Sequence, residues 1–235
     1  MKTPFVSIRL CMATTYQPTD RRPIASRKRK IWQKAAAALA ARNVSPSCIS
    51  ILGMLAGFVA GAALYATSLT AGWPERLLWL AAAVFIQTRL LANMLDGMVA
   101  IALQRASLLG ELYNELPDRA SDLAIIIGAG YAAGSSPGLG YLAACIAVLT
   151  AYVRAVGKSA GASNLFVGPM AKPQRMFTLT VVSLLMVALP RGYRPEWGTQ
   201  HLGLAALGLM VIILGGCITV CRRIGLTARH LQSAR

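Results

Sequence analysis

Long apolar stretches separated by short polar connections make up most of the chain after residue 48. Within them, charged side chains almost disappear over roughly 18 or more residues, the length that a helix needs to cross a bilayer. We therefore predict a membrane-spanning helix in each stretch, with ends placed to within several residues. The six predicted spans are residues 49–69, 78–100, 120–134, 138–156, 176–190 and 202–221.

The predicted fold class is an all-α integral membrane protein, with six transmembrane helices and an N-terminal interfacial amphipathic helix. Composition agrees, because 56% of the 235 residues are hydrophobic and only 14% are charged, which is typical of a membrane protein. The third span, 120–134, is short and begins among charged residues, so its helix is expected to start before the hydrocarbon and to project into a polar cavity. An even number of spans places both termini on the same side.

The segment before the first span changes character at Arg27. Residues 27–45 are basic and rich in alanine and carry Ile31 and Trp32, which favours a helix lying on the cytoplasmic leaflet over a merely solvated basic tail. Asn43, Ser45 and Pro46 supply the break and cap before the first span. The expected parts are a poorly ordered tail (1–26), the interfacial helix (27–45), a six-helix transmembrane catalytic domain (46–224) and a basic C-terminal tail (225–235).

Lys and Arg are distributed unequally between the two sides of the predicted bundle. The N-terminal segment, the 101–119 and 154–175 connections and the C-terminal tail hold nearly all of them, whereas the opposite loops hold only Arg76, Arg191 and Arg194. The positive-inside rule therefore places the termini and the two basic connections in the cytoplasm, in a multi-pass protein of the inner (cytoplasmic) membrane. The net charge of +16 follows the membrane flanks, which favours anionic lipid headgroups over nucleic acid as its partner.

Acidic residues are rare and clustered. Five of the eight, Asp96, Glu111, Glu115, Asp118 and Asp122, lie between positions 96 and 122. Carboxylates at a membrane boundary are costly unless they are paired, hydrated or bound to a cation, so this cluster is the candidate functional site. A structural alternative is that the acids pair with Arg89, Arg105 and Arg119 and only anchor helix ends; the clustering favours a site.

The spacing within this region predicts two polar faces that meet. Asn93, Asp96, Gly97 and Ala100 recur at helical intervals at the end of the second span, and Gly110, Asn114, Asp118 and Asp122 recur every fourth residue at the start of the third,. Two antiparallel helices joined by a short connection bring these faces together. Oxygen ligands without His or Cys select hard cations such as Mg²⁺ or Mn²⁺, and the small residues leave room for a ligand or for close packing.

The same segment resembles the signature of the CDP-alcohol phosphatidyltransferases, D-x-x-D-G-x-x-A-R, eight residues, then G-x-x-x-D-x-x-x-D. The matching positions are Asn93, Asp96, Gly97, Ala100, Gly110, Asn114 and Asp118. The resemblance extends to Asn43-Val44-Ser45-Pro46 leading to Ile49-Ser50 at the entry to the first span. It also extends to Tyr152-Val153-Arg154 followed by Gly168, Lys172, Pro173, Gln174 and Arg175 in the fourth connection.

The resemblance implies an enzyme of phospholipid biosynthesis with six helices, usually a homodimer. It implies transfer of a phosphatidyl group from CDP-diacylglycerol to a polar alcohol with release of CMP, and Asp118 as the general base. Two divalent cations, Mg²⁺ or Mn²⁺, are expected at Asn93, Asp96, Asn114 and Asp118. Donor and acceptor phosphates are expected at Gly97, Ala100, Gly110, Arg105, Arg154, Lys172 and Arg175.

Three positions depart from the signature, because Asn93 and Asn114 replace Asp and Ile101 replaces Arg. An Asn oxygen can still coordinate a cation, but the loss of two negative charges weakens binding. Asp122, Glu115 or Glu111 could compensate for the charge, and Arg105 for the guanidinium.

Other functions stay open at this point. A weakened or inactive relative of the family is motivated by the three departures. A CDP-choline or CDP-ethanolamine type transferase is disfavoured by the short chain. A small ion transporter, for which Arg89 within the second span is the one supporting feature, is disfavoured because the acids lie near one membrane face.

Overall fold

The computed structural model describes residues 29–104, 108–162, 167–190, 194–198 and 201–233, with side chains over 108–114 excepted. Three of the predicted site residues, Arg105, Gly110 and Asn114, therefore lie outside the described side chains. The helices are α1 (Lys30–Ala41), α2 (Pro46–Ala66), α3 (Trp73–Ala102), α4 (Leu108–Gly130), α5 (Pro137–Ser159), α6 (Lys172–Ala188) and α7 (Leu204–Ser233), with a 3₁₀ turn at Thr67–Leu69.

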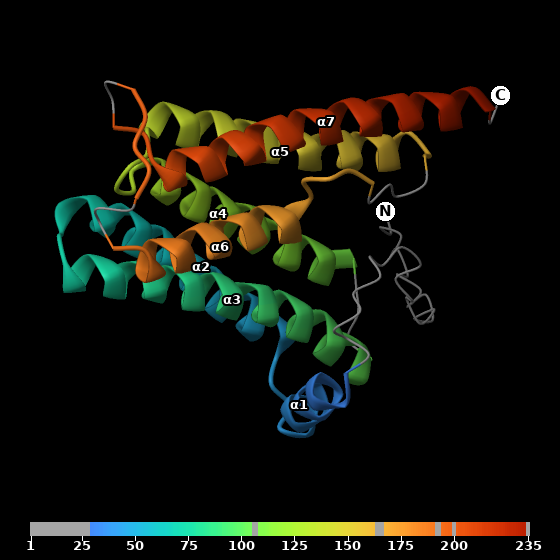
Figure 1. The fold of residues 1–235 in the computed structure, drawn as a ribbon. Coiled ribbons are helices and arrows are strands. Elements are labelled where there is room, and N and C mark those ends of the chain that lie inside the picture. The colour runs from blue at the N-terminus through green and yellow to red at the C-terminus, as the bar shows by residue number, and fades with distance from the viewer. Residues whose placement is uncertain (1–28, 105–107, 163–166, 191–193, 199–200, 234–235) are drawn as a thin grey trace, which may run out of the picture.

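Six of these helices form a closed ring (Figure 1). α2 packs against α3 and α4, α4 against α5, α5 against α7, α7 against α6, and α6 against α3. Apolar side chains from all six helices fill one core inside the ring. Each predicted span corresponds to one of these helices, although α7 continues through residues 222–233, well beyond the predicted span end at 221.

Proline marks the start of four helices. It occupies the first or second position of α2, α3, α5 and α6, where its fixed φ suits a helix and its missing N–H is not needed. At the start of α2, Asn43 adopts a left-handed φ of 52° that Asn tolerates better than most residues. Ser45 lies at the N-cap of α2 but makes no side-chain capping bond; its carbonyl instead accepts from the amides of Cys48 and Ile49.

A stripe of glycines lets α2 approach its neighbours closely. Gly53, Gly57 and Gly61 recur every fourth residue along α2. A Cβ added at Gly57 would lie 2.5 Å from the Ser121 Cβ, and one at Gly61 would lie 2.4 Å from the Ala124 carbonyl oxygen. Small residues at such spacing allow helix backbones to pack at short distance, and here they fix the position of α4 against α2.

The outer surface of the ring is apolar. Large side chains such as Leu52, Phe58, Val84 and Leu214 are between 43% and 65% exposed, whereas soluble proteins rarely expose such continuous apolar surface. Four helices, α2 with its 3₁₀ turn, α3, α5 and α7, are long and apolar enough to cross a membrane. α4 and α6 lie within the same ring.

α1 packs across the end of the bundle where α3 ends (Figure 1). Ala36 is its buried contact, within a small cluster that includes Ile49 of α2 and Val99 of α3. Its other face is exposed, including Ile31 at 65%. The helix therefore lies beside the end of the bundle that carries the acidic cluster.

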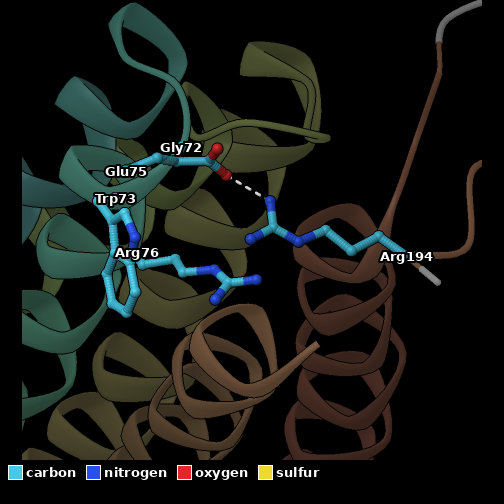
Figure 2. A pocket seen from close by; sticks show the side chains of 5 residues that line it. All are labelled: Gly72, Trp73, Glu75, Arg76 and Arg194. Atoms are coloured by element: carbon cyan, nitrogen blue, oxygen red, sulfur yellow. Dashed lines mark hydrogen bonds and ion pairs between the residues drawn. The ribbon is translucent and has the colours of Figure 1, made fainter. Parts of the chain in front are cut away.

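A buried ion pair holds the opposite end together (Figure 2). Glu75 at the start of α3 pairs with Arg194 from the α6–α7 connection, and their side chains are 1% and 10% exposed. Arg194 also donates to the carbonyls of Met186 and Leu189. A cavity of about 300 Å³ lies beside this pair, and it lies far along α3 from the acidic cluster, near residue 96.

Candidate active site

The candidate site lies where α3 ends and where α4 and α6 begin. α3 and α4 make few direct backbone contacts there, so charged side chains rather than close helix packing connect them. Asp118, Ser121 and Asp122 project from one face of α4, as their i, i+3 and i+4 spacing requires. The opposing cations come from α3 (Arg89) and from the first turn of α6.

Asp118 is held between two cations. One of its oxygens pairs with Nη2 of Arg89, and the other lies 2.8 Å from Nζ of Lys172. Its side chain is only 9% exposed. Both oxygens of Asp118 are therefore in contact with basic groups, one from α3 and one from α6.

Arg89 is fixed by α4 although it belongs to α3. Its Nε donates to Ser121 Oγ at 2.7 Å, and Ser121 Oγ in turn donates to the Pro117 carbonyl at 2.8 Å. The Arg89 side chain is 1% exposed, and its Nη1 has no hydrogen-bond partner among the described residues. Arg89 lies one helical turn before Asn93 on α3, but its partners are on α4.

Asp122 is neutralised by α6. Its two oxygens face Nζ of Lys172 at 3.5 Å and Nη2 of Arg175 at 3.1 Å. Arg175 also donates to the Met170 carbonyl at 3.3 Å. Lys172 thus bridges Asp118 and Asp122, and the acidic face of α4 is matched by basic side chains of α6.

Asp96 lies in a separate, mostly neutral setting. Ser50 of α2 donates to one of its oxygens at 2.7 Å, and the Gly97 amide lies 2.5 Å from the other. Its nearest charged influences are Arg89 and Lys172. With both oxygens accepting only neutral donors, Asp96 keeps lone pairs available for a cation.

The described carboxylates do not form a metal site on their own. No three Asp, Glu, His or Cys side chains in the described part of the chain could hold a metal by themselves, so a divalent cation would also need an amide oxygen as a ligand. The Asn93 amide faces the two Asp118 oxygens at 3.1 and 3.3 Å. The distances are those of the amide nitrogen, which in this orientation donates to both Asp118 oxygens; the amide oxygen would be the atom that binds a cation. Asp96 lies one turn along α3, on the same helix face.

Other predicted residues lie elsewhere. Arg154 of α5 pairs with Glu115 at 3.0 Å, and Arg119 pairs with the same carboxylate, so Glu115 is matched by arginines and does not face Asp118. Gly97 and Ala100 lie on the Asp96 face of α3, half-buried. Sequence analysis missed Ser121, because nothing in its small polar side chain singled it out. Ser50 was named there only as part of the entry to the first span, without a role.

Three solved structures of phosphatidylinositol phosphate synthase (PgsA1) from Mycobacterium tuberculosis share this fold. The structure with CDP-DAG bound has a TM-score of 0.65 at 20% identity, over 85% of this chain and 94% of that one. The complex with manganese and citrate has a TM-score of 0.65 at 18% identity, covering 83% and 88%. The apo form has a TM-score of 0.60 at 21% identity, covering 82% and 93%.

Sequence comparison alone finds less. No family model matches this chain, and no curated protein matches it. The six-helix fold that the resemblance implies is therefore matched in three dimensions, over 82% to 85% of this chain. Four apolar helices of spanning length agree with a multi-pass membrane protein, and the chain has the fold of a phosphatidylinositol phosphate synthase.

Proposed function

We propose that the chain transfers a phosphatidyl group from CDP-diacylglycerol to a hydroxyl of a polar alcohol and releases CMP, as a step of phospholipid synthesis. One observation carries the proposal. The signature residues Asn93, Asp96 and Asp118, separated in sequence, gather with Lys172 and Arg175 at one end of the bundle, in the fold of a protein solved with CDP-DAG bound.

The chemistry assigned to these residues is an in-line displacement. The acceptor oxygen attacks the phosphorus that bears the diacylglycerol. The bond from that phosphorus to the bridging oxygen breaks, and CMP leaves with the oxygen. Asp118, which matches the last acidic position of the signature, accepts the hydroxyl proton as general base. Lys172 and Arg175 orient phosphate oxygens through charge-assisted hydrogen bonds.

A divalent ion is part of the proposal. Asp96, Asn93 and Asp118 would hold Mg²⁺ or Mn²⁺, which supplies positive charge to the leaving CMP. A manganese complex of a protein with the same fold supports this choice of ion. Oxygen-only donors also favour these hard cations over zinc.

The membrane arrangement is proposed from charge and packing. α4 and α6 are proposed to cross together with the four apolar helices, because they close the same ring. The basic segments lie at the α1 end, so this end and the site are assigned to the cytoplasm of the inner membrane. α1 is assigned to the membrane interface, with Ile31 toward the lipid. We also propose a homodimer, which the family resemblance implies.

The test uses the purified full-length chain in lipid nanodiscs, with CDP-diacylglycerol and a panel of alcohols that includes glycerol phosphate, inositol phosphate and serine. We expect CMP release that depends on one class of alcohol and stops with EDTA. An inactive relative, the alternative motivated by Asn93 and Asn114, predicts no CMP release with any acceptor. Release that persists without an alcohol would indicate a hydrolase.

A further inference from the structure

Arg89 has a place in the site that the signature does not provide for. It is a guanidinium one turn before Asn93, buried to 1% exposure, and it contacts the carboxylate of Asp118. Burying a charge costs several kcal/mol unless it is paired and hydrogen-bonded. The buried pair of Arg89 and Asp118 is therefore part of the charge balance of the site.

The surroundings of Arg89 are built to keep it in position. Ser121 Oγ accepts a hydrogen bond from Nε of Arg89 and donates one to the Pro117 carbonyl. Gly53 on α2 provides the space, because a Cβ there would lie 3.3 Å from Nη1 of Arg89 and 2.7 Å from the Ala92 Cβ. The guanidinium is therefore immobilised by three helices, and its buried Nη1 has no hydrogen-bond partner among the described residues.

Acidic and basic groups of the described cluster are nearly matched without any ion. The three carboxylates of Asp96, Asp118 and Asp122 lie among three basic side chains, Arg89, Lys172 and Arg175. Burial lowers the pKa of Lys172 to about 7, so that it carries only part of a positive charge at neutral pH. A diphosphate diester adds two negative charges, which a single divalent cation balances. A second divalent ion would leave an excess of positive charge in a buried site, where Coulomb repulsion is weakly screened.

The same balance explains the departures from the signature. With Asp at all four positions, four negative charges match two divalent ions. With Asn93 and Asn114 in place, the four positions hold two negative charges and match one ion. Arg89 adds a fixed positive charge beside Asp118, which is one of the four positions.

We propose that this site binds one divalent cation per chain, and that Arg89 supplies the second positive charge, next to Asp118, toward the diphosphate of the nucleotide donor. The inference rests on the proposed function for the identity of the donor. It departs from the two ions implied by the family resemblance, and the number of bound ions tests it independently of turnover.

The primary experiment counts Mn²⁺ ions bound by the purified full-length chain in nanodiscs, from the loss of the free Mn²⁺ signal in electron paramagnetic resonance. The titration is run with and without CDP. We expect about one ion per chain in both cases. A count of about two, or no binding, would overturn the proposal.

Variants then test the part assigned to Arg89. Asn93→Asp with Asn114→Asp restores four acidic positions, yet with Arg89 present we expect only one tight Mn²⁺ site, because the guanidinium repels a second ion. Adding Arg89→Gln should bring the count to about two ions. Adding Arg222→Gln, which removes an exposed positive charge from α7, should leave it at one.

The role of Arg89 would be contradicted if the Asn93→Asp, Asn114→Asp chain, with Arg89 intact, bound a second ion. The affinity for that ion would have to lie within roughly threefold of the affinity for the first. Should the Arg89→Gln variant fail to fold, the wild-type and double-variant counts still decide. A chain that binds one ion but releases no CMP would remove the proposed transferase function while leaving the ion count, and this inference, standing.

Discussion

The pair formed by Arg89 and Asp118 links the stability of the bundle to its chemistry, and a double-mutant cycle can separate the two. Asp118→Asn keeps the shape of the side chain but leaves Arg89, 1% exposed, without its counter-charge. Removing one partner of a buried pair typically costs about 3–5 kcal/mol. Arg89→Gln should cost a similar amount, because it leaves Asp118 with Lys172 alone.

The double variant should be destabilised by less than the sum of the two single variants, because neither group is then left charged and unpaired. We expect a coupling free energy of about 2 kcal/mol, within the range measured for residues in contact. Equilibrium unfolding in mixed detergent micelles measures it. Glu115→Gln is the matched control: Glu115 is also paired with two arginines and lies one turn earlier on α4, but it is 48% exposed, so its loss should cost less than about 1 kcal/mol.

Turnover of the same variants tests the base. Asp118→Asn should reduce CMP release by at least about a hundredfold, and the double variant should stay that slow even though its fold is partly restored. A coupling below about 0.5 kcal/mol would refute the buried pair. Recovery of activity in the double variant would show that Asp118 is a counter-ion for Arg89 and not a base.

Three further predictions follow from other contacts. Gly61→Val should destabilise the bundle by at least about 2 kcal/mol, because its Cβ would lie 2.4 Å from the Ala124 carbonyl oxygen. Gly225→Ala, with open space around it, should not destabilise the bundle. Equal melting temperatures for these two variants would contradict the packing account. Glu75→Gln, which leaves the buried Arg194 without its counter-charge, should lower the free energy of unfolding by about 3 kcal/mol or more. The protein that remains folded should release CMP at the wild-type rate. A change in stability below about 0.5 kcal/mol would contradict this prediction. EDTA should abolish CMP release and Mg²⁺ or Mn²⁺ should restore it, and full turnover in metal-free buffer would exclude the metal.

Helix positions follow from sequence because each apolar run is long, but their ends do not. The prediction starts the fifth span at 176, whereas α6 begins at Lys172, because a hydropathy window excludes the polar first turn that carries Lys172 and Arg175. α4 begins at Leu108 for the same reason, which agrees with the expectation that its helix starts before the apolar stretch. α7 reaches Ser233 because polar residues such as Arg229 do not interrupt a helix.

The candidate site is predictable only where spacing determines it. Helical intervals place Asn93 and Asp96 on one face, and the signature relates them to Asp118. Pairing across helices depends on how the ring closes, so the contacts of Asp118 with Arg89 and Lys172 could not be read from spacing. The pairing of Arg154 with Glu115, rather than a position beside Asp118, has the same origin.

The most direct test of the proposed reaction follows one phosphorus atom. CDP-diacylglycerol labelled with ³²P at the phosphate that bears the diacylglycerol is incubated with the purified chain, Mg²⁺ and the preferred alcohol, and the products are separated into lipid and aqueous phases. The account predicts that the label appears in a new phospholipid while unlabelled CMP is released in equal amount, and that Asp118→Asn prevents both. Label that leaves with the nucleotide, or that appears as phosphatidic acid whether or not an alcohol is present, would contradict phosphatidyl transfer.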